Sequence, residues 1–345
     1  MQLCFAPMDG ITNCATRQLT AEVFAKYKST EDKLILRTEF MNVDGFLRNP
    51  DGVIHHLYTT ASQKPIAQIY GGNEKTLIEA AVKIEREYGE SFSGIELNTG
   101  CPSVTVMKCG GGSELMKNKM RTMNIIQNLS QNLTFLPFSI KARIGLNEED
   151  KADQFDFLVQ ASQYCCKISV HGRTLKQGYS GDVDWEFIGN LKCVVSDRCE
   201  VIGNGGILAY DQAIDYGERY KLDGIMIGQA AIGNPRIFTP HQPTNAEKMD
   251  VILRHLELYV SSDLLSCSER GKLYPYILLD EIEEQIKIIR KNPDFSSHAL
   301  VEFRKFLFAY VKGISDSREW KTRMLTASTY GEVRDEIVRF FERIV

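Results

Sequence analysis

The chain has 345 residues, of which 43% are hydrophobic and 25% are charged, with 26 glycines and 10 prolines. These fractions exclude disordered, collagen-like and low-complexity chains, and the length predicts one large domain with a smaller one. The net charge of -4, from 41 Lys and Arg against 45 Asp and Glu, disfavours a nucleic-acid binder that is basic overall.

The cysteines and the N-terminal segment indicate the compartment. Nine cysteines is an odd number, and no Cys-x-x-Cys pair occurs, so we expect reduced thiols and neither disulfides nor a metal site. The N-terminus lacks the pattern of a signal peptide, and the sequence has no run of roughly 18 apolar residues that predicts a membrane span. We therefore expect a cytoplasmic protein that has no membrane segment and binds no metal.

Eight short apolar or β-branched runs predict strands along the first two thirds of the chain. They are Leu3–Met8, Leu34–Phe40, Pro65–Tyr70, Gly94–Leu97, Phe138–Ile144, Lys167–Val170, Val201–Ile202 and Gly224–Ile227. The stretches between them are long enough for helices, and Glu74–Tyr88 has an apolar face behind an N-cap candidate at Asn73. Because no early Gly-x-Gly-x-x-Gly turn occurs, the alternation favours an α/β fold of the (β/α)8 TIM-barrel type over a doubly wound sheet.

The pattern changes after Phe238, where a turn-rich connector leads into helical periodicity without further strand signals. We predict a catalytic barrel domain over residues 1–240 and an all-helical domain over residues 246–345. In the second domain, residues 304–323 include six basic and two acidic residues. This segment is either a solvated helix face or a surface for an anionic partner, and composition leaves both open.

The polar residues that follow the predicted strands are candidates for a site, because a TIM-barrel site forms at the C-terminal ends of the strands. Glycine-bearing turns follow the last two strands, where backbone N–H groups can approach a phosphate. Either turn alone is explained as a tight connection, but the two together favour a phosphorylated ligand. Lys141 and His171 are each followed two residues later by an arginine, which favours an anionic ligand over purely structural roles.

Cys101 differs from the other cysteines by its place in an Asn-x-Gly-Cys-Pro segment after a predicted strand. Most cysteines in such a chain are small buried hydrophobic residues. A thiol with an ordinary pKa of about 8.5 is mostly protonated at neutral pH, so it can donate a proton as well as act as a nucleophile. Both roles are open for Cys101 at this point.

The motifs, taken in order, resemble those of the flavin-dependent tRNA-dihydrouridine synthases. They are Asn98-x-Gly100-Cys101-Pro102, Gly110-x-Gly112-x-x-Leu115, Lys141-x-Arg143, His171-Gly172-Arg173-Thr174, Asn204-Gly205, Ile227-Gly228 and, in the tail, Phe303-Arg304-Lys305. No single motif is specific, but the ordered set covers most of the chain. The segments 6–10 and 38–40 are most similar to the bacterial C class.

The resemblance implies a reduction of specific tRNA uridines to 5,6-dihydrouridine, with FMN as cofactor and NADPH as electron donor. Hydride passes from flavin N5 to uracil C6, and Cys101 matches the general acid that protonates C5. The implied cofactor-binding residues are Pro7, Met8, Asp9, Gln68, Lys141, His171, Asn204, Gly205, Gly206, Gly228 and Gln229. The implied substrate-binding residues are Asn98, Arg143, Arg173 and Tyr179 near the uracil, and Arg304, Lys305, Lys312 and Lys321 on the tRNA. We expect a monomer.

Two departures from the family pattern concern the phosphate site. The family often has an acidic residue at the position of Gly206 and an arginine at the position of Gln229. If backbone N–H groups hold the phosphate, both changes are tolerable; if a guanidinium is required, FMN binds more weakly here.

Three other functions remain open. An FMN-dependent ene reductase or a dihydroorotate-type dehydrogenase would share the flavin residues, but a small-molecule enzyme does not need a basic helical tail. A Schiff-base aldolase would use Lys141 and would be colourless. A catalytically silent RNA-binding protein is disfavoured by the combined presence of Asn98, Cys101, Lys141 and His171.

Overall fold

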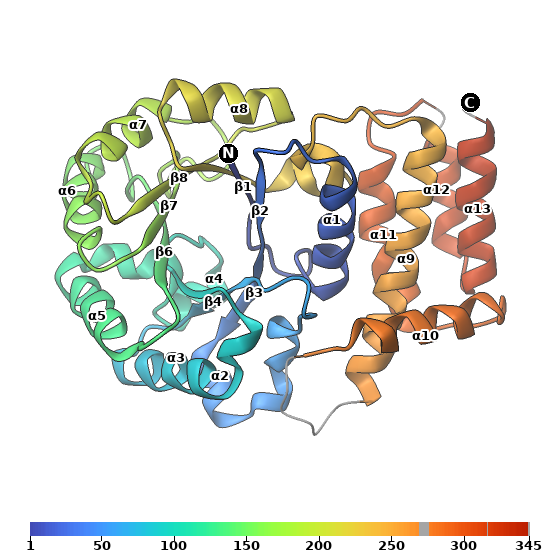
Figure 1. Ribbon diagram of the computed structural model, residues 1–345, viewed down its shortest axis with the longest axis horizontal. Coiled ribbons are helices and arrows are strands. Elements are labelled where there is room, and N and C mark those ends of the chain that lie inside the picture. The colour runs from blue at the N-terminus through green and yellow to red at the C-terminus, as the bar shows by residue number, and fades with distance from the viewer. Residues whose placement is uncertain (269–275, 316, 344–345) are drawn as a thin grey trace.

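Nine parallel strands form the centre of the molecule in the computed structural model, which describes residues 1–268, 276–315 and 317–343 (Figure 1). They are β1 (Gln2–Phe5), β2 (Lys33–Ile35), β3 (Arg37–Asn42), β4 (Ile66–Tyr70), β5 (Gly94–Asn98), β6 (Phe138–Arg143), β7 (Lys167–His171), β8 (Glu200–Asn204) and β9 (Gly224–Ile227). Their order in the sheet is β2-β1-β9-β8-β7-β6-β5-β4-β3. The first and last strands of this order are consecutive in the chain, so the sheet curls into a nearly closed barrel.

The second predicted strand is divided in two. β2 pairs with β1, whereas β3 pairs with β4, and the interruption falls at Leu36. The register of β3 against β4 shifts between Arg37 and Phe40, which is the irregularity of a β-bulge. The prediction of a TIM barrel is therefore confirmed. The second of the eight strand positions is filled by two short strands, β2 and β3.

Helices cover the outside of the barrel (Figure 1). They are α1 (Cys14–Tyr27), α2 (Val43–Arg48), α3 (Glu74–Tyr88), α5 (Lys119–Asn132), α6 (Lys151–Ala161), α7 (Trp185–Val194) and α8 (Tyr210–Arg219), while the short α4 (Val104–Lys108) belongs to the loop between β5 and α5. The predicted cap of α3 is confirmed, because the Asn73 side chain accepts hydrogen bonds from the backbone N–H groups of Lys75 and Thr76. The apolar face of this helix, including Leu77 and Ile84, is fully buried.

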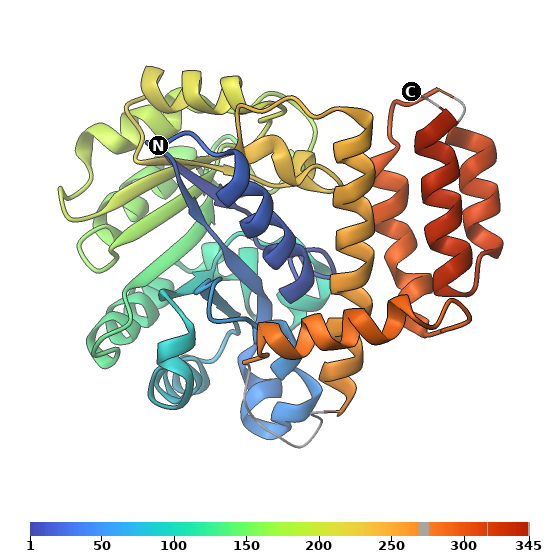
Figure 2. The same ribbon diagram turned by 45° about the vertical axis from the view of Figure 1, so that its right-hand side comes forward.

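The rest of the described chain is helical (Figure 2). It contains α9 (Asn245–Ser268), α10 (Leu279–Arg290), α11 (His298–Tyr310), α12 (Ser317–Thr326) and α13 (Tyr330–Arg343). The long helix α9 lies between α1 of the barrel and the other C-terminal helices. It is joined to α1 by an ion pair between Arg254 and Glu22 at 2.8 Å and by a hydrogen bond between His255 Nε2 and Thr16 Oγ1 at 3.1 Å. The barrel and the helices are thus packed through polar as well as apolar contacts.

Within the described ranges, no helix combines the length and the apolar character that crossing a membrane requires.

Candidate active site

A cavity of about 660 Å³ lies at the C-terminal ends of the strands. It is lined by every candidate that the barrel sequence supplies: Pro7, Met8, Asp9, Gln68, Asn98, Cys101, Lys141, Arg143, His171, Arg173, Tyr179, Asn204, Gly205, Gly206, Gly228 and Gln229. Parallel strands place all their carboxyl ends at one side of a barrel, which is why residues so far apart in sequence meet here. A cavity of this size is in the range of roughly 300–1,000 Å³ that holds cofactors and small ligands.

A chain of hydrogen bonds fixes the loop that carries Cys101. The Glu96 carboxylate accepts a hydrogen bond from Gln68 Nε2 at 2.7 Å, and Gln68 Oε1 accepts one from Asn98 Nδ2 at 3.1 Å. Asn98 Oδ1 then accepts the backbone N–H groups of Gly100, at 3.2 Å, and Cys101, at 3.0 Å. The direction of each amide is therefore determined by its neighbour, and β4 and β5 together position the cysteine.

The Cys101 thiol is half-buried in the cavity wall. Its carbonyl oxygen accepts hydrogen bonds from the Ser113 backbone N–H at 3.0 Å and hydroxyl at 2.9 Å, so the loop is anchored on both sides of the residue. Burial raises the pKa of the thiol above its usual value, although the nearby Lys141 and Arg143 charges act in the opposite direction. At neutral pH this cysteine is a protonated group, and it is better suited to donate a proton than to attack as a thiolate.

Lys141 projects from β6 into the same cavity. Burial lowers the pKa of its ammonium group to about 8, and the charge of Glu96 raises it in partial compensation. Lys141 Nζ donates to Asn204 Oδ1 at 3.3 Å, and Asn204 Nδ2 donates to the Met226 carbonyl at 2.8 Å. Lys141 therefore places a poorly hydrated positive charge in the wall of the cavity.

Arg143, which ends β6, and Arg173, which follows β7, have mainly structural contacts. Arg143 is 3% exposed, and its guanidinium donates to the carbonyl groups of Gly100, Thr174 and Gly178, each at 3.0 Å. Arg173 Nε donates to the Gly181 carbonyl at 2.9 Å. These bonds tie the loops together at the cavity rim, while Arg143 also lies 5.9 Å from the centroid of the exposed Tyr179 ring.

His171 is a buried neutral imidazole. Burial, followed by the charges of Lys141, Arg143 and Arg173, holds its pKa far below its usual range. Its ring packs against the glycine turn after β8, where a Cβ on Gly205 would approach the ring to 2.9 Å. Gly205 also has a φ of +125°, a conformation that L side chains rarely adopt.

The glycine turns fit the phosphate of a nucleotide cofactor. Gly206 follows Gly205 with a φ of +69°, and in the other turn the short helix η5 (Gln229–Ala231) begins directly after Gly228. A Cβ on Gly228 would meet only ordinary contacts, at 3.5 Å or more, so the backbone there lies beside open space. Helix N-termini and turns of this kind present N–H groups to anions without a guanidinium.

An ion pair that the sequence analysis missed lies beneath the cavity. Arg37 Nε and Glu96 Oε1 are 3.0 Å apart with both side chains fully buried, and Arg37 Nη2 donates to Ser169 Oγ at 3.0 Å. These residues come from β3, β5 and β7 and so fill the barrel interior. The sequence contained a signal for this pair. Arg37 and Glu96 each interrupt an apolar strand segment, which indicates that each side chain points inward to a group of opposite charge.

The tail candidates lie away from this cavity. In the described part of the tail, Arg304 Nη2 donates to the Ala327 carbonyl at 2.8 Å, while Lys312 is exposed and Lys321 half-buried. Lys305 lies at a second cavity between α1, α9 and α11. Arg323 is paired with Glu336 at 2.8 Å and with Glu319 at 2.6 Å. The basic segment is therefore divided among several environments and is not one uniform face.

Comparison with known proteins gives a consistent result. The family model described as dihydrouridine synthase matches residues 4–344. The probable tRNA-dihydrouridine synthase of Staphylococcus aureus (strain COL) is 28% identical over 340 residues, covering 95% of this chain and 90% of the relative. The protein of the same name from Aquifex aeolicus (strain VF5) is 27% identical over 346 residues, covering 99% of this chain and 96% of the relative. Among solved structures, that of TcOYE with pHBA has a TM-score of 0.46 and 10% identity, covering 68% of this chain and 87% of the other.

Proposed function

The chain belongs to the dihydrouridine synthase family, and on that premise we propose that it reduces uridines in tRNA to 5,6-dihydrouridine with bound FMN and with NADPH as electron donor. The observation that carries the proposal is that the half-buried Cys101, Lys141 and the two glycine turns all line the same cavity. We also propose that the protein is cytoplasmic, is a monomer and binds no metal. The relatives from Staphylococcus aureus and Aquifex aeolicus bear the name of this activity.

The residues of the cavity divide between the two ends of a flavin nucleotide. Gly205, Gly206, Gly228 and Gln229 would hold the phosphate through backbone N–H groups. Lys141 and Gln68 would face the polar edge of the ring, and the segment Pro7–Asp9 would cover the ring. When bound, the flavin supplies the hydride that adds to C6 of the uracil.

The protein supplies charge and a proton to this reaction. The Lys141 ammonium stabilises negative charge that develops beside it, and it does so more strongly in a partly desolvated site than in water. Cys101 donates the proton that C5 of the uracil requires after hydride addition at C6. The raised pKa of this thiol supports the role, because the proton is still present at neutral pH.

The test combines flavin spectroscopy with product analysis. The purified protein should be yellow and should form dihydrouridine in an unmodified tRNA transcript when NADPH is added, as measured by nucleoside mass spectrometry. Cys101→Ala should retain flavin and its reduction by NADPH but form dihydrouridine about 10²–10⁴ times more slowly, the usual contribution of general acid catalysis. Cys109→Ala is the matched control, since Cys109 is an exposed thiol in the same loop region.

The outcomes separate the competing functions. Unchanged uridine reduction by Cys101→Ala contradicts the acid role. A yellow protein that reduces a small enone or a free pyrimidine but not tRNA is an ene reductase or a dihydroorotate-type enzyme. A protein that binds tRNA without reducing it in the presence of NADPH is a silent RNA-binding protein.

The contribution of the tail is tested by charge reversal. Lys312 and Lys321 lie at or near the surface, and we assign them, with Arg304 and Lys305, to contacts with the tRNA backbone. Lys312→Glu with Lys321→Glu should weaken tRNA binding and reduce its dependence on salt concentration, because fewer counterions are released. Unchanged affinity and an unchanged salt slope would show that this surface does not contact the tRNA.

A further inference from the structure

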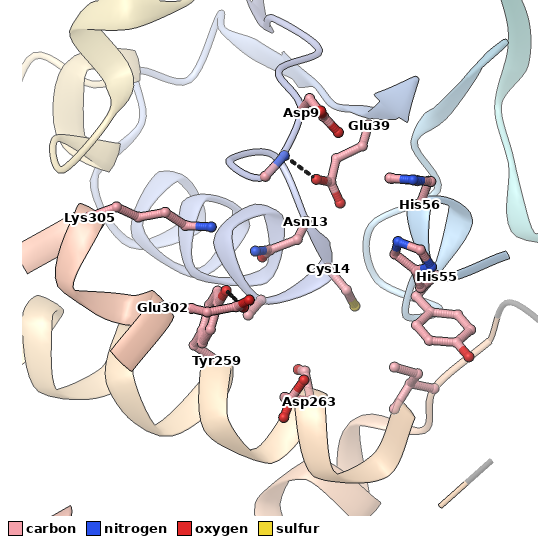
Figure 3. Close-up of a pocket in the computed structure, with 15 residues that line it drawn as sticks. Asp9, Asn13, Cys14, Glu39, His55, His56, Tyr259, Asp263, Glu302 and Lys305 are labelled. Carbon is pink, nitrogen blue, oxygen red and sulfur yellow. Dashed lines mark hydrogen bonds between the residues drawn. The ribbon is translucent and has the colours of Figure 1, made fainter. Parts of the chain in front are cut away.

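A second cavity, of about 340 Å³, lies between the barrel and the helical domain (Figure 3). Its walls come from the loop after β1, from α1 and β3, from the segment before β4, and from α9 and α11. Asp9 lines this cavity and also lines the active-site cavity. The two spaces are therefore neighbours that meet at Asp9.

The lining is acidic. Four acidic residues, Asp9, Glu39, Asp263 and Glu302, line the cavity together with a single lysine, Lys305. Such a lining favours a ligand that presents N–H donors or a positive charge. The Glu302 carboxylate already accepts a hydrogen bond from the Tyr259 hydroxyl at 3.0 Å, which leaves the opposite wall as the main recognition surface.

Three polar groups converge on that opposite wall. One carboxylate oxygen from each of Asp9 and Glu39 and one imidazole nitrogen of His56 all lie within 4.8 Å of one another. The buried Glu39 carboxylate accepts the Gly10 backbone N–H at 2.6 Å. Nδ1 of His56 is buried and has no hydrogen-bond partner among the residues that the structure describes. Buried polar atoms are normally paired, so this wall is incomplete without a ligand.

Protonation supports the same conclusion. Burial raises the pKa of Glu39 to about 7, while the charge of the buried Arg17 and the Gly10 N–H lower it in part. Burial lowers the pKa of His56 to about 4, so this imidazole is neutral at physiological pH. A ligand that donates hydrogen bonds would stabilise the ionised Glu39 and replace the water that burial has removed.

The cavity also has planar side chains. The rings of His55 and His56 are 4.0 Å apart at an interplanar angle of 38°, and the Tyr259 ring lies on the opposite helix. Figure 3 shows the histidine pair facing the open space from one side while Tyr259 and Asp263 approach it from α9. Flat aromatic faces beside hydrogen-bonding groups are what proteins use to hold an unstacked base.

We propose that this cavity receives a second nucleobase of the tRNA, next to the uridine that is reduced, and that this base carries an exocyclic amino group. Its N–H groups would donate to the carboxylates of Glu39 and Asp9. The inference rests on the proposed function, since it requires tRNA as the substrate. Uracil has one N3–H donor and no amino group, so it can meet only one of these two carboxylates, whereas a base with an amino group can meet both.

The position of the cavity fits a neighbouring nucleotide. An enzyme that extracts a base from its stack leaves the adjacent bases without a stacking partner, at a cost of a few kcal/mol. A pocket that shares Asp9 with the active site is placed to receive one of those bases and to offset part of this cost. Lys305, whose Nζ lies 5.7 Å from the Tyr259 ring centroid and 5.3 Å from that of Phe306, supplies a cation at this cavity for the attached phosphate.

A divalent cation is the other ligand that two carboxylates and an imidazole can hold. Two neighbouring charges oppose it, because the electrostatic effects of Arg17 and Lys305 both reach Glu39. Arg17 and Lys305 would repel a cation, but they do not repel an uncharged base that donates hydrogen bonds to Glu39. The observations therefore favour the base.

The experiment is a double-mutant cycle between protein and RNA. Transcripts carry an abasic residue at each position within two nucleotides of the reduced uridine, and tRNA affinity is measured for the flavin-loaded wild type and for Glu39→Gln. One abasic position should weaken wild-type binding roughly 10- to 100-fold, as expected for hydrogen bonds to a charged group. In Glu39→Gln the same abasic residue should change the affinity less than about threefold, because the interaction is already lost.

Controls separate local damage from lost recognition. Glu87→Gln alters an exposed carboxylate on α3 and should reproduce the wild-type response. Glu39→Gln keeps an oxygen that can accept the Gly10 N–H, so its flavin absorbance should be unchanged; His56→Ala, which leaves that bond in place, is the second probe. If each abasic residue weakens tRNA binding by the same factor in Glu39→Gln and His56→Ala as in the wild type, the inference is overturned.

Two further outcomes are distinguishable. If the wild type forms dihydrouridine in tRNA but no abasic position couples to Glu39 or His56, only the second-base inference fails. If it forms none, the proposed function fails and the inference fails with it. Saturable Mn²⁺ binding by the RNA-free protein, followed by electron paramagnetic resonance and lost in Glu39→Gln, would assign the cavity to a cation and overturn the base.

Discussion

Replacing Glu96 by glutamine tests the interior of the barrel, because this carboxylate joins the structural ion pair to the active-site hydrogen bonds. Glu96 pairs with Arg37 at 3.0 Å in a fully buried setting and accepts Gln68 Nε2 at 2.7 Å. A glutamine oxygen can still accept the bond from Gln68. The change therefore removes mainly the negative charge and leaves the Arg37 guanidinium buried without a counter-charge.

The expected loss of stability is large. Removing one partner of a buried ion pair costs roughly 3–5 kcal/mol, which corresponds to about two to three and a half orders of magnitude in the unfolding constant. Because the Glu96 charge also raises the pKa of Lys141, the variant should lower that pKa further and weaken the positive charge in the active site. Glu96→Gln should therefore lose activity as well as stability.

Equilibrium unfolding in urea, followed by circular dichroism on flavin-free protein, measures the effect. Glu87→Gln is the matched control, since its pair with Lys83 at 2.7 Å is partly exposed and should contribute less than about 1 kcal/mol. The double variant Arg37→Met/Glu96→Gln should recover at least half of the loss, because it removes the unpaired charge. A change of less than 1 kcal/mol in Glu96→Gln, or no recovery in the double variant, would refute the assigned role of the pair.

Two other predictions concern pH and the phosphate turn. Burial lowers the pKa of Lys141 from 10.5 to about 8, so between these pH values the unfolded chain binds more protons and stability should rise with pH. Lys141→Met should flatten this rise in urea midpoints measured across the window, and a steeper rise would contradict the argument. Gly205→Ala should lose bound flavin and about 1–3 kcal/mol of stability, because its φ is +125° and the new Cβ would lie 2.9 Å from the His171 ring. Gly178→Ala, with a φ of +60° and no atom within 4 Å, should show only the backbone cost and should retain flavin; equal flavin absorbance in both variants would refute the steric explanation.

Much of the site was predictable because a parallel barrel converts sequence order into spatial proximity. An apolar run marks each strand, and the polar residue that follows it must lie at the same end of the barrel. Cys101 follows β5, Lys141 lies in the C-terminal half of β6 and Asn204 ends β8, and all three line one cavity. Their chemical roles rested on the resemblance to the family, since strand ends alone do not distinguish a catalytic group from a structural one.

The interior ion pair was not predictable in the same way. Arg37 and Glu96 are separated by 59 positions and meet across the barrel, so no local periodicity relates them. The division of the second strand at Leu36 has a similar origin, because the apolar run is continuous through the irregularity. Register in a closed sheet is set by neighbouring strands, which a single sequence does not display.

The basic tail shows the limit of composition. Six cations in residues 304–323 suggested one surface, but Arg323 is paired with Glu336 of α13 and Arg304 is bonded to the Ala327 carbonyl. Glu336 neutralises Arg323 and the Ala327 carbonyl occupies part of the Arg304 guanidinium, so the charge of the segment overstates what can contact a phosphate. The helix bundle, not the charge count, decides which lysines remain available.

The loop after β1 connects the two cavities physically. Glu39 accepts the Gly10 N–H at 2.6 Å, and the Thr12 hydroxyl accepts the Met8 N–H at 2.9 Å, so both ends of the segment that carries Asp9 are held. The far wall of the second cavity belongs to α9, whose contact to α1 through His255 and Thr16 is buried. Because the same short loop lines the active-site cavity and the second cavity, a base held in the second would fix the distance at which the uridine enters the first. The C-terminal helices would then act on the proposed reaction by positioning the tRNA, without placing any of their residues in the active-site cavity.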